Sequence, residues 1–398
     1  MTMRVLMFTP FLPPNAGGIA LAVHHLTQGL VEEGANVCAA APGRHNPQLE
    51  STLYNVYRFA IPRGTWRFHL EDHVFAWFLK RAVRASRPDV IHAHNAIPTG
   101  SACVRLPRAC GIPVVLTCHG EDIQSLPELN RGYRLVPRHS ARIAAAIARA
   151  DALVALTPDM RQDYLDAGSA ATHITIIPNA IAPTAPERTL RADARRRLEI
   201  DDKAFVILAV GRNIPEKGFA FLLQALGHLA QSPQPVVTLI CGRDVTQLKS
   251  EVATRNPGPD LRLFDHAAPL GQPSRCPPGT PSMEELYAAA DILVMPSLVE
   301  AMGLVTAEAM AAGLPVVAFD SPGTRHVVQA GLTGLLVPAR SARQLAEAIE
   351  DLRRDPQKRQ SLGAMGAKAA RRYDRRTVAR SHLDLYEKLI RTNERILT

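Results

Sequence analysis

Two carboxylates separated by seven residues stand out in the segment PSLVEAMGLVTAEAMAAGLPVV, residues 296–317. Glu300 follows a short apolar run that predicts a strand, and Glu308 falls in a helix predicted over 304–312. The two side chains cannot share one helix face, so the first could reach a sugar while the second reaches a ribose. The alternative for Glu308 is solvated helix surface, but its neighbours are apolar and a lone carboxylate there needs a partner.

A pair of cations follows the strand predicted over 205–210. Arg212 comes directly after Gly211, and Lys217 comes five residues later, just before a predicted helix. Ligands of open α/β sheets gather at the carboxyl ends of strands, and Arg and Lys are the side chains that bind phosphate oxygens. We therefore interpret them as a diphosphate site; the alternative is an ordinary surface Arg and Lys.

Backbone N–H groups at two predicted helix starts offer further phosphate contacts. Gly303 and Leu304 begin the helix that carries the second carboxylate. Gly17 and Gly18 lie between the first predicted strand and the first predicted helix, where glycine lets a ligand approach the backbone. The second pair is also compatible with a plain tight turn, and its surroundings do not match the GxGxxG dinucleotide fingerprint.

One histidine occupies a position typical of catalytic groups. His119 follows the strand predicted over 113–117 and is itself followed by Gly120 and two carboxylates. The alternative is a buried histidine that bonds to the backbone. The other histidines, among them His92 and His94, receive no functional assignment from the sequence.

Length and composition set the frame for these residues. A chain of 398 residues exceeds what one hydrophobic core usually serves, which predicts two domains. Its six cysteines form no CxxC pair, so neither a zinc site nor a disulfide framework is indicated, and a reducing cytoplasm fits best. No apolar stretch is long enough to span a bilayer, and the N-terminus resembles a strand and loop more than a signal peptide.

Strand and helix patterns alternate through both halves, which predicts an α/β protein with two parallel sheets. The expected strands are 4–9, 36–41, 89–92, 113–117, 152–156, 174–177, 205–210, 236–241, 291–295 and 316–319, and the expected helices are 19–33, 190–200, 219–230, 304–312 and 373–397. Residues 255–282 are expected to form a long Pro-rich loop. We place the first domain at 1–182 and the second at 183–373, with the last helix, about 374–398, returning to the first.

Several enzyme classes are disfavoured by missing motifs. The sequence contains no HExxH, no GxSxG and no P-loop, which argues against metalloproteases, serine hydrolases and NTPases. No Asp-x-Asp occurs either, so the usual means of holding a divalent metal on a nucleotide diphosphate is missing. We therefore expect no metal site and no cofactor.

Taken in order, these motifs resemble those of retaining GT-B glycosyltransferases, most closely family 4. The Glu300–Glu308 pair resembles the E-x7-E element of that family, usually written EPFGLxxxEAMAxGxPVV. Further matches are Gly17-Gly18, His119-Gly120, Pro178-Asn179, and Gly211-Arg212 with Lys217-Gly218, so the resemblance covers essentially the whole chain. It implies two Rossmann-like domains that face each other across a cleft, the first for the acceptor and the second for a nucleotide-sugar donor.

The resemblance also implies roles at matching positions. Gly18 would approach the donor phosphates, Gly17 would border the acceptor pocket, and His119 would contact the transferred sugar. Arg212 and Lys217, beside Gly211, would neutralise the leaving diphosphate in place of a metal. Glu300 would hold sugar hydroxyls, Glu308 would bind the ribose, and Gly303 and Leu304 would offer N–H groups to the diphosphate. The implied reaction is metal-independent hexosyl transfer from a UDP- or GDP-sugar to a glycan, lipid-linked or small-molecule acceptor.

Some positions depart from the family pattern. Ala301-Met302 replaces Pro-Phe, Pro322-Gly323 replaces Gly-Gly, and His326 stands where Glu is common. Ala180 also follows Pro178-Asn179 where Gly is usual. These differences leave the nucleotide base, the donor sugar and the acceptor open.

Other interpretations remain open on the sequence. Another GT-B sugar-nucleotide enzyme, an epimerase or a phosphorylase, would share most of the motifs. A nucleic-acid-binding protein would suit the net charge of +9, but aromatic residues make up only 5%, so stacking platforms are scarce. Aromatic and basic residues in 63–87, with a basic run in 131–142, fit either peripheral contact with the inner face of a membrane or a helix whose aromatics pack inward.

Overall fold

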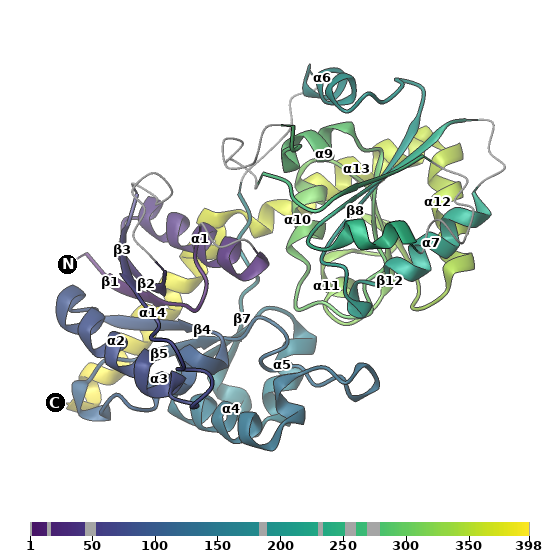
Figure 1. Ribbon diagram of the computed structural model, residues 1–398. Helices are drawn as coiled ribbons and strands as arrows, with labels where there is room; N and C mark the ends of the chain where they lie inside the picture. Colours follow the sequence, from purple (N-terminus) through teal and green to yellow (C-terminus); the bar gives the residue numbers. More distant parts are fainter. Residues whose placement is uncertain are drawn as a thin grey trace. The chain divides into compact units, whose positions relative to one another are not determined.

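The computed structural model describes residues 2–13, 17–43, 53–182, 189–229, 234–250, 260–268 and 279–397. The chain divides into two compact units, which are coloured along the sequence in Figure 1. Unit 1 comprises Met1–Ile181 and Tyr373–Thr398, and unit 2 comprises Ala182–Arg372. The sequence predicted the two domain boundaries after residues 182 and 373, and each lies one residue later than the boundary in the structure.

Unit 1 is built on a seven-stranded sheet in the order β3-β2-β1-β4-β5-β6-β7, in which every pair of neighbours is parallel. Its strands are β1 (Arg4–Phe8), β2 (Asn36–Pro42), β3 (Asn55–Phe59), β4 (Val90–His94), β5 (Val114–Thr117), β6 (Ala152–Ala155) and β7 (Ile174–Ile176). The central strands are buried along their length, as parallel strands covered on both faces must be.

Helices cover this sheet, and the last of them comes from the far end of the chain. They are α1 (Gly18–Glu32), α2 (Glu71–Ser86), α3 (Ser101–Cys103), α4 (Pro137–Arg149), α5 (Pro158–Asp166) and α14 (Arg375–Leu397), with short helical turns η1 (Ala96–Gly100), η2 (Arg108–Cys110), η3 (Pro127–Leu129), η4 (Tyr133–Leu135) and η5 (Ala171–His173). Val378, Ala379 and Tyr386 of α14 are buried in one core with Val23 and Leu26 of α1. The final helix is therefore an integral part of unit 1 (Figure 1).

Ion pairs fix the start of that helix. Arg375 bonds Glu32 at 2.5 Å, and Arg380 bonds the adjacent Glu33 at 2.7 Å. Gly29 of α1 lies so close to α14 that a Cβ atom there would be 2.3 Å from the carbonyl oxygen of Arg375. The two helices therefore pack backbone to backbone at this point.

Unit 2 repeats the plan with a six-stranded parallel sheet in the order β10-β9-β8-β11-β12-β13. Its strands are β8 (Phe205–Val210), β9 (Val236–Cys241), β10 (Asp260–Phe264), β11 (Ile292–Met295), β12 (Val316–Asp320) and β13 (Gly334–Pro338). Its helices are α6 (Thr189–Arg197), α7 (Phe219–His228), α9 (Met283–Ala289), α10 (Leu304–Ala311), α11 (Thr324–Val327), α12 (Ala342–Arg354) and α13 (Pro356–Ala370), with turns η6 (Pro215–Lys217), η7 (Val245–Gln247) and η9 (Arg371–Tyr373).

The expectation of one long loop over 255–282 is wrong in part, because β10 lies inside it and pairs with β9. Only Leu261 and Leu263 of that strand pack against the core, and polar residues alternate with them at the sheet edge. Edge strands β3 and β13 were also missed, since each is a short, half-exposed run of five residues. Residues 255–259 and 269–278 of the expected loop, and 183–188 of the expected linker, lie outside the described residues.

Candidate functional site

The residues singled out in unit 2 gather at the switch point of its sheet. The chain runs from β8 outward to β9 and β10, then returns to build β11, β12 and β13 on the other side. Arg212 follows β8 and Glu300 follows β11, so the loops that carry them leave neighbouring strands at the same edge. Ligands of open α/β sheets bind at such a point.

An ion pair joins these two loops. Nζ of Lys217 lies 2.5 Å from Oε1 of Glu300, and the side chains are only 20% and 11% exposed. Gly218 makes this closeness feasible, because its φ is +65° and a Cβ atom would lie 2.0 Å from the carbonyl oxygen of Pro296. The cation expected to bind a diphosphate and the carboxylate expected to bind a sugar are thus direct neighbours.

The loop of Glu300 is fixed by the segment after β12. The Glu300 amide donates to the carbonyl oxygen of Pro322 at 3.0 Å. A Cβ atom on Gly323, whose φ is +81°, would lie 2.1 Å from the carbonyl oxygen of Glu300. The Pro322-Gly323 pair therefore sets the backbone position of the carboxylate.

Glu308 has the partner that its apolar surroundings required. The hydroxyl of Tyr287, in α9, donates to Oε2 of Glu308 at 2.9 Å, and both side chains are buried. Burial raises the pKa of Glu308 to about 7, and this hydrogen bond opposes the rise. The carboxyl therefore titrates close to neutral pH.

The start of α10 and Arg212 complete the unit 2 group. Gly303 caps α10 with a φ of +83°, and Leu304 begins the helix. The first backbone N–H groups of α10 point out of its N-terminal end, as in any α-helix. Arg212 is exposed, and within the part of the chain that the structure describes its guanidinium makes no ion pair. Helix terminus and cation are both suited to an anion.

Unit 1 places its candidates at the matching point of its own sheet. The strand order of this sheet reverses between β1 and β4. The loop after β1 ends at Gly17, whose φ is +136°. Gly18 is the first residue of α1, so the helix start follows directly. His119 stands two residues after β5, and its amide donates to Oδ1 of Asp122 at 2.9 Å.

The ring of His119 is paired with a second histidine that the sequence did not single out. Nδ1 of His94, the last residue of β4, lies 3.0 Å from Nε2 of His119. Burial lowers the pKa of His119 to about 4 and that of His94 well below its ordinary value, so both rings are neutral at pH 7. The sequence signal for His94 is its position at the end of a strand. In the structure it is paired in register with Thr117 of β5, two residues before His119.

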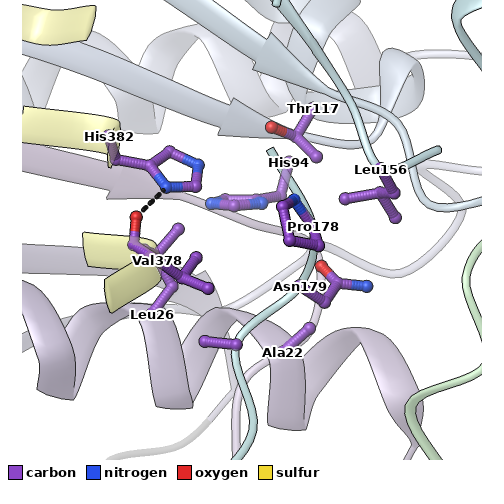
Figure 2. Close-up of a pocket in the computed structure, with 10 residues that line it drawn as sticks. Ala22, Leu26, His94, Thr117, Leu156, Pro178, Asn179, Val378 and His382 are labelled. Carbon is purple, nitrogen blue, oxygen red and sulfur yellow. Dashed lines mark hydrogen bonds between the residues drawn. The ribbon is translucent and has the colours of Figure 1, made fainter. Parts of the chain in front are cut away.

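Two further histidines lie near His94: His382 lines a small pocket with it (Figure 2), and the His92 ring lies 4.2 Å from the His94 ring, centre to centre. His92 bonds the Tyr386 hydroxyl at 2.6 Å through Nδ1 and the Thr117 hydroxyl at 2.7 Å through Nε2. His94 and His382 line the pocket with Pro178 and Asn179, and Nε2 of the buried His94 has no hydrogen-bond partner within the described ranges. Helix α14 thus supplies His382 to the pocket that His94 also lines, and its Tyr386 bonds His92.

Metal-ligating side chains are not grouped in the described part of the chain. No three His, Cys, Asp or Glu residues among those described are arranged so that they could hold a metal ion. The phosphate-binding candidates of unit 2 are instead cationic side chains and backbone N–H groups.

Two family models match the chain, one in each unit. Residues 191–369 match the model described as glycosyl transferases group 1, and residues 16–185 match the model described as glycosyltransferase family 4. The first match therefore contains all six strands of unit 2, and the second contains β2 to β7 of unit 1.

Similar curated proteins extend over most of the chain. The D-inositol 3-phosphate glycosyltransferase 1 of Catenulispora acidiphila is 31% identical over 368 residues, which is 88% of this chain and 85% of that protein. The phosphatidyl-myo-inositol mannosyltransferase of Mycobacterium leprae is 28% identical and covers 99% of both chains.

Solved structures share the fold. The sucrose-phosphate synthase of Thermosynechococcus elongatus superposes with a TM-score of 0.77 at 23% identity, covering 98% of this chain and all of that one. HepE of Anabaena, in complex with UDP, gives 0.74 at 20% identity and covers 97% of this chain. The two parallel sheets with their helices are therefore the two Rossmann-like domains of a GT-B fold.

Proposed function

The chain belongs to the group 1 glycosyltransferases, and from this premise we propose that it transfers a hexose from a UDP- or GDP-sugar to a hydroxyl group. We further propose that transfer retains the anomeric configuration and needs no divalent metal. The observation that carries the proposal is the Lys217–Glu300 pair, which puts a cation and a carboxylate together at the switch point of the unit 2 sheet.

Each side chain has a role that its chemistry suits. Arg212 and Lys217 bind the diphosphate, and the N–H groups at Gly303 and Leu304 bind its other oxygens. Glu300 accepts hydrogen bonds from sugar hydroxyls once the phosphate takes over part of the charge of Lys217. Since a diphosphate gains negative charge as it leaves, these groups stabilise the transition state more than the ground state.

The donor nucleoside is assigned to Glu308. Its carboxylate lies in α10, eight residues beyond Glu300, with Tyr287 holding one of its oxygens. The second oxygen, Oε1, can accept hydrogen bonds from the two hydroxyls of a ribose. This contact is strongest when Glu308 is ionised, so we expect donor binding to depend on pH near its pKa of about 7.

The proposed step breaks the bond between the anomeric carbon and the diphosphate oxygen, and it forms the bond to the acceptor oxygen on the same face of the ring. The acceptor proton passes to the leaving phosphate oxygen, so the products are a glycoside and a nucleoside diphosphate. His119, neutral and held by its neighbour, contacts the transferred sugar, and Gly17 and Gly18 let acceptor and phosphates approach the backbone.

The acceptor is proposed only as a class. The names of the curated relatives concern an inositol phosphate and phosphatidylinositol, so a phosphorylated or lipid-linked polyol is the first choice for assays. We place the reaction in the cytoplasm, because the five described cysteines are free thiols, as expected in a reducing compartment.

A ligand screen by thermal unfolding tests the proposal. The protein is heated with UDP, GDP, ADP and their common sugar conjugates, with EDTA present throughout. A ligand that binds only the folded state at about 100 times its Kd should add about 2.7 kcal/mol to the stability. We expect one nucleotide to stabilise the protein, and Arg212→Ala to abolish that effect.

Arg343→Ala is the matched control, because Arg343 is an exposed arginine of the same unit on helix α12. It should keep the full stabilisation by the nucleotide. If no nucleotide stabilises a folded sample, or if stabilisation requires a divalent metal, the proposed donor site is wrong.

A further inference from the structure

Large apolar side chains are exposed together on one part of unit 1. Four of them lie between residues 66 and 77, just before α2 and in its first two turns. They are Trp66, Phe68, Leu70 and Trp77, with exposed fractions of 53%, 67%, 46% and 54%. The segment also contains Phe75, which is completely buried. The aromatics are therefore divided: one set fills the core, and a second set is left on the surface.

A second segment joins this surface through ion pairs. Arg142 of α4 lies 2.7 Å from Glu71 and also bonds Asp72, both in the first turn of α2. These contacts hold the start of α4 beside the start of α2, and both helices contact α3 (Figure 1). Leu135 and Val136, just before α4, are exposed as well. The six exposed apolar residues are Trp66, Phe68, Leu70, Trp77, Leu135 and Val136. We call them, together with the cations around them, the aromatic–basic surface.

The charge around these apolar side chains is positive. The exposed cations of residues 63–87 are Arg63, Arg67, Lys80, Arg81, Arg84 and Arg87. The acidic residues of that segment are Glu71 and Asp72, and Arg142 forms an ion pair with each of them. The guanidinium of Arg81 lies 4.8 Å from the centre of the Trp77 ring, and that of Arg67 lies 5.9 Å from the Phe68 ring. Two of the exposed aromatic rings therefore each lie against an arginine.

We propose that the aromatic–basic surface docks unit 1 on a membrane that contains anionic lipids. Indole and phenyl rings flanked by arginine are the side chains that insert at the headgroup boundary of a bilayer, while cations attract the anionic headgroups. No described helix is long and apolar enough to cross the bilayer, so the contact is peripheral. This inference concerns a surface of unit 1 alone and does not depend on the proposed donor site.

Two tryptophans make the proposal directly measurable, since Trp66 and Trp77 are the only ones in the chain. All tryptophan emission therefore comes from the aromatic–basic surface. On addition of vesicles of phosphatidylcholine mixed with phosphatidylglycerol, we expect the emission to shift to the blue and to be quenched by brominated acyl chains. Vesicles of phosphatidylcholine alone should change it far less, and Trp66→Phe and Trp77→Phe separate the two contributions.

Flotation with the same vesicles compares variants. Trp66→Ala combined with Phe68→Ala should weaken binding about tenfold or more, because the inserted rings are lost. Arg67→Gln combined with Lys80→Gln should weaken it about twenty-five-fold, at about fivefold per charge, and added salt should weaken all binding. Leu332→Ala removes an equally exposed apolar side chain in unit 2, and Lys203→Gln with Lys249→Gln removes two exposed cations there; neither control should change binding.

Thermal unfolding without vesicles confirms that each variant is folded. Absence of flotation with anionic vesicles at low salt would overturn the proposal, and so would binding that the surface variants leave unchanged. Self-association that the aromatic variants abolish, without vesicle binding, would instead identify the surface as a contact between two copies of the chain.

Discussion

Nδ1 of His94 and Nε2 of His119 face each other at 3.0 Å, at the carboxyl ends of two adjacent strands of unit 1. The contact occupies one ring nitrogen of His119 and leaves its Nδ1 for a substrate. This contact restrains the ring, and Asp122 holds the backbone amide of His119. His94 is therefore placed to act as a positioning residue for His119.

The first prediction concerns this pair. His94→Leu should lower kcat about tenfold to a hundredfold while leaving KM for the donor nearly unchanged, since a ring displaced by a fraction of an ångström no longer meets the reacting sugar. His94→Asn should recover part of the loss, because its amide occupies the place of Nδ1. Steady-state kinetics measures the split, and nitrogen NMR shifts of the His119 ring report its tautomer. Equal losses in both variants, with an unchanged His119 spectrum, would show that His94 only fills space.

The second prediction concerns acid stability. The pKa values of His25, His119 and His382 are each lowered to about 4 by burial, and all three lie in unit 1. Unfolded histidine binds its proton near pH 6.5, so the stabilisation is complete above that pH and is lost as pH falls toward 4. We expect unit 1 to lose about 1.4 kcal/mol per pH unit for each of these groups over that interval. Calorimetric scans at decreasing pH should therefore show unit 1 melting before unit 2, and simultaneous melting at every pH would contradict this.

The third prediction concerns Glu308, whose pKa of about 7 is raised by burial. A raised carboxyl pKa gives stability that is complete below the unfolded value of about 4.5 and is lost as pH rises through about 7. Glu308→Gln should therefore be more stable than the wild type at about pH 8, and nearly equal to it at about pH 5. Chemical denaturation at the two pH values measures the difference.

The same carboxyl predicts how donor binding responds to pH. If ionised Glu308 accepts the ribose hydroxyls, nucleotide affinity should rise as pH increases through about 7. Tyr287→Phe removes the hydroxyl that stabilises the carboxylate, so the rise should move to higher pH. Titration calorimetry across this range tests the idea, and an affinity that is independent of pH in both proteins would remove Glu308 from the ribose site.

The fourth prediction concerns Gly323. Gly323→Ala places a Cβ atom 2.1 Å from the carbonyl oxygen of Glu300, so it should displace the Glu300 loop and cost well over 1 kcal/mol of stability. Gly331→Ala is its control, because Gly331 also has a positive φ of +74° but has open space around it. The control should show the backbone strain alone, with donor transfer retained. Loss of transfer in Gly331→Ala but not in Gly323→Ala would refute the role assigned to Pro322-Gly323.

The sequence predicted most of the buried strands, since parallel strands covered on both faces are continuous apolar runs. Edge strand β10 escaped because its Asp260 and Arg262 interrupt the apolar residues. The positions of the unit 2 candidates in the fold could be predicted, because strand ends and helix starts fix them. The direct pairing of Lys217 with Glu300 could not, because it arises from a close backbone contact at Gly218.

Side chains that come from distant parts of the chain were equally hidden. Tyr287 lies 21 residues before Glu308, and its hydrogen bond follows from how α9 and α10 pack, which no local pattern encodes. The histidine cluster depends on α14, whose Tyr386 meets His92 across 294 residues of sequence. Periodicity predicts that such helices form, but not which buried polar groups they bring together.

Transfer in EDTA, followed by proton NMR from the first turnovers, tests the central claim most directly. The donor identified by the nucleotide screen is incubated with the acceptor, or with water as acceptor, and the anomeric signal of the first product is observed before it can equilibrate. We predict transfer without a divalent metal, and a product with the same anomeric configuration as the donor sugar. An inverted first product, or transfer that appears only when a divalent metal is restored, would contradict the account.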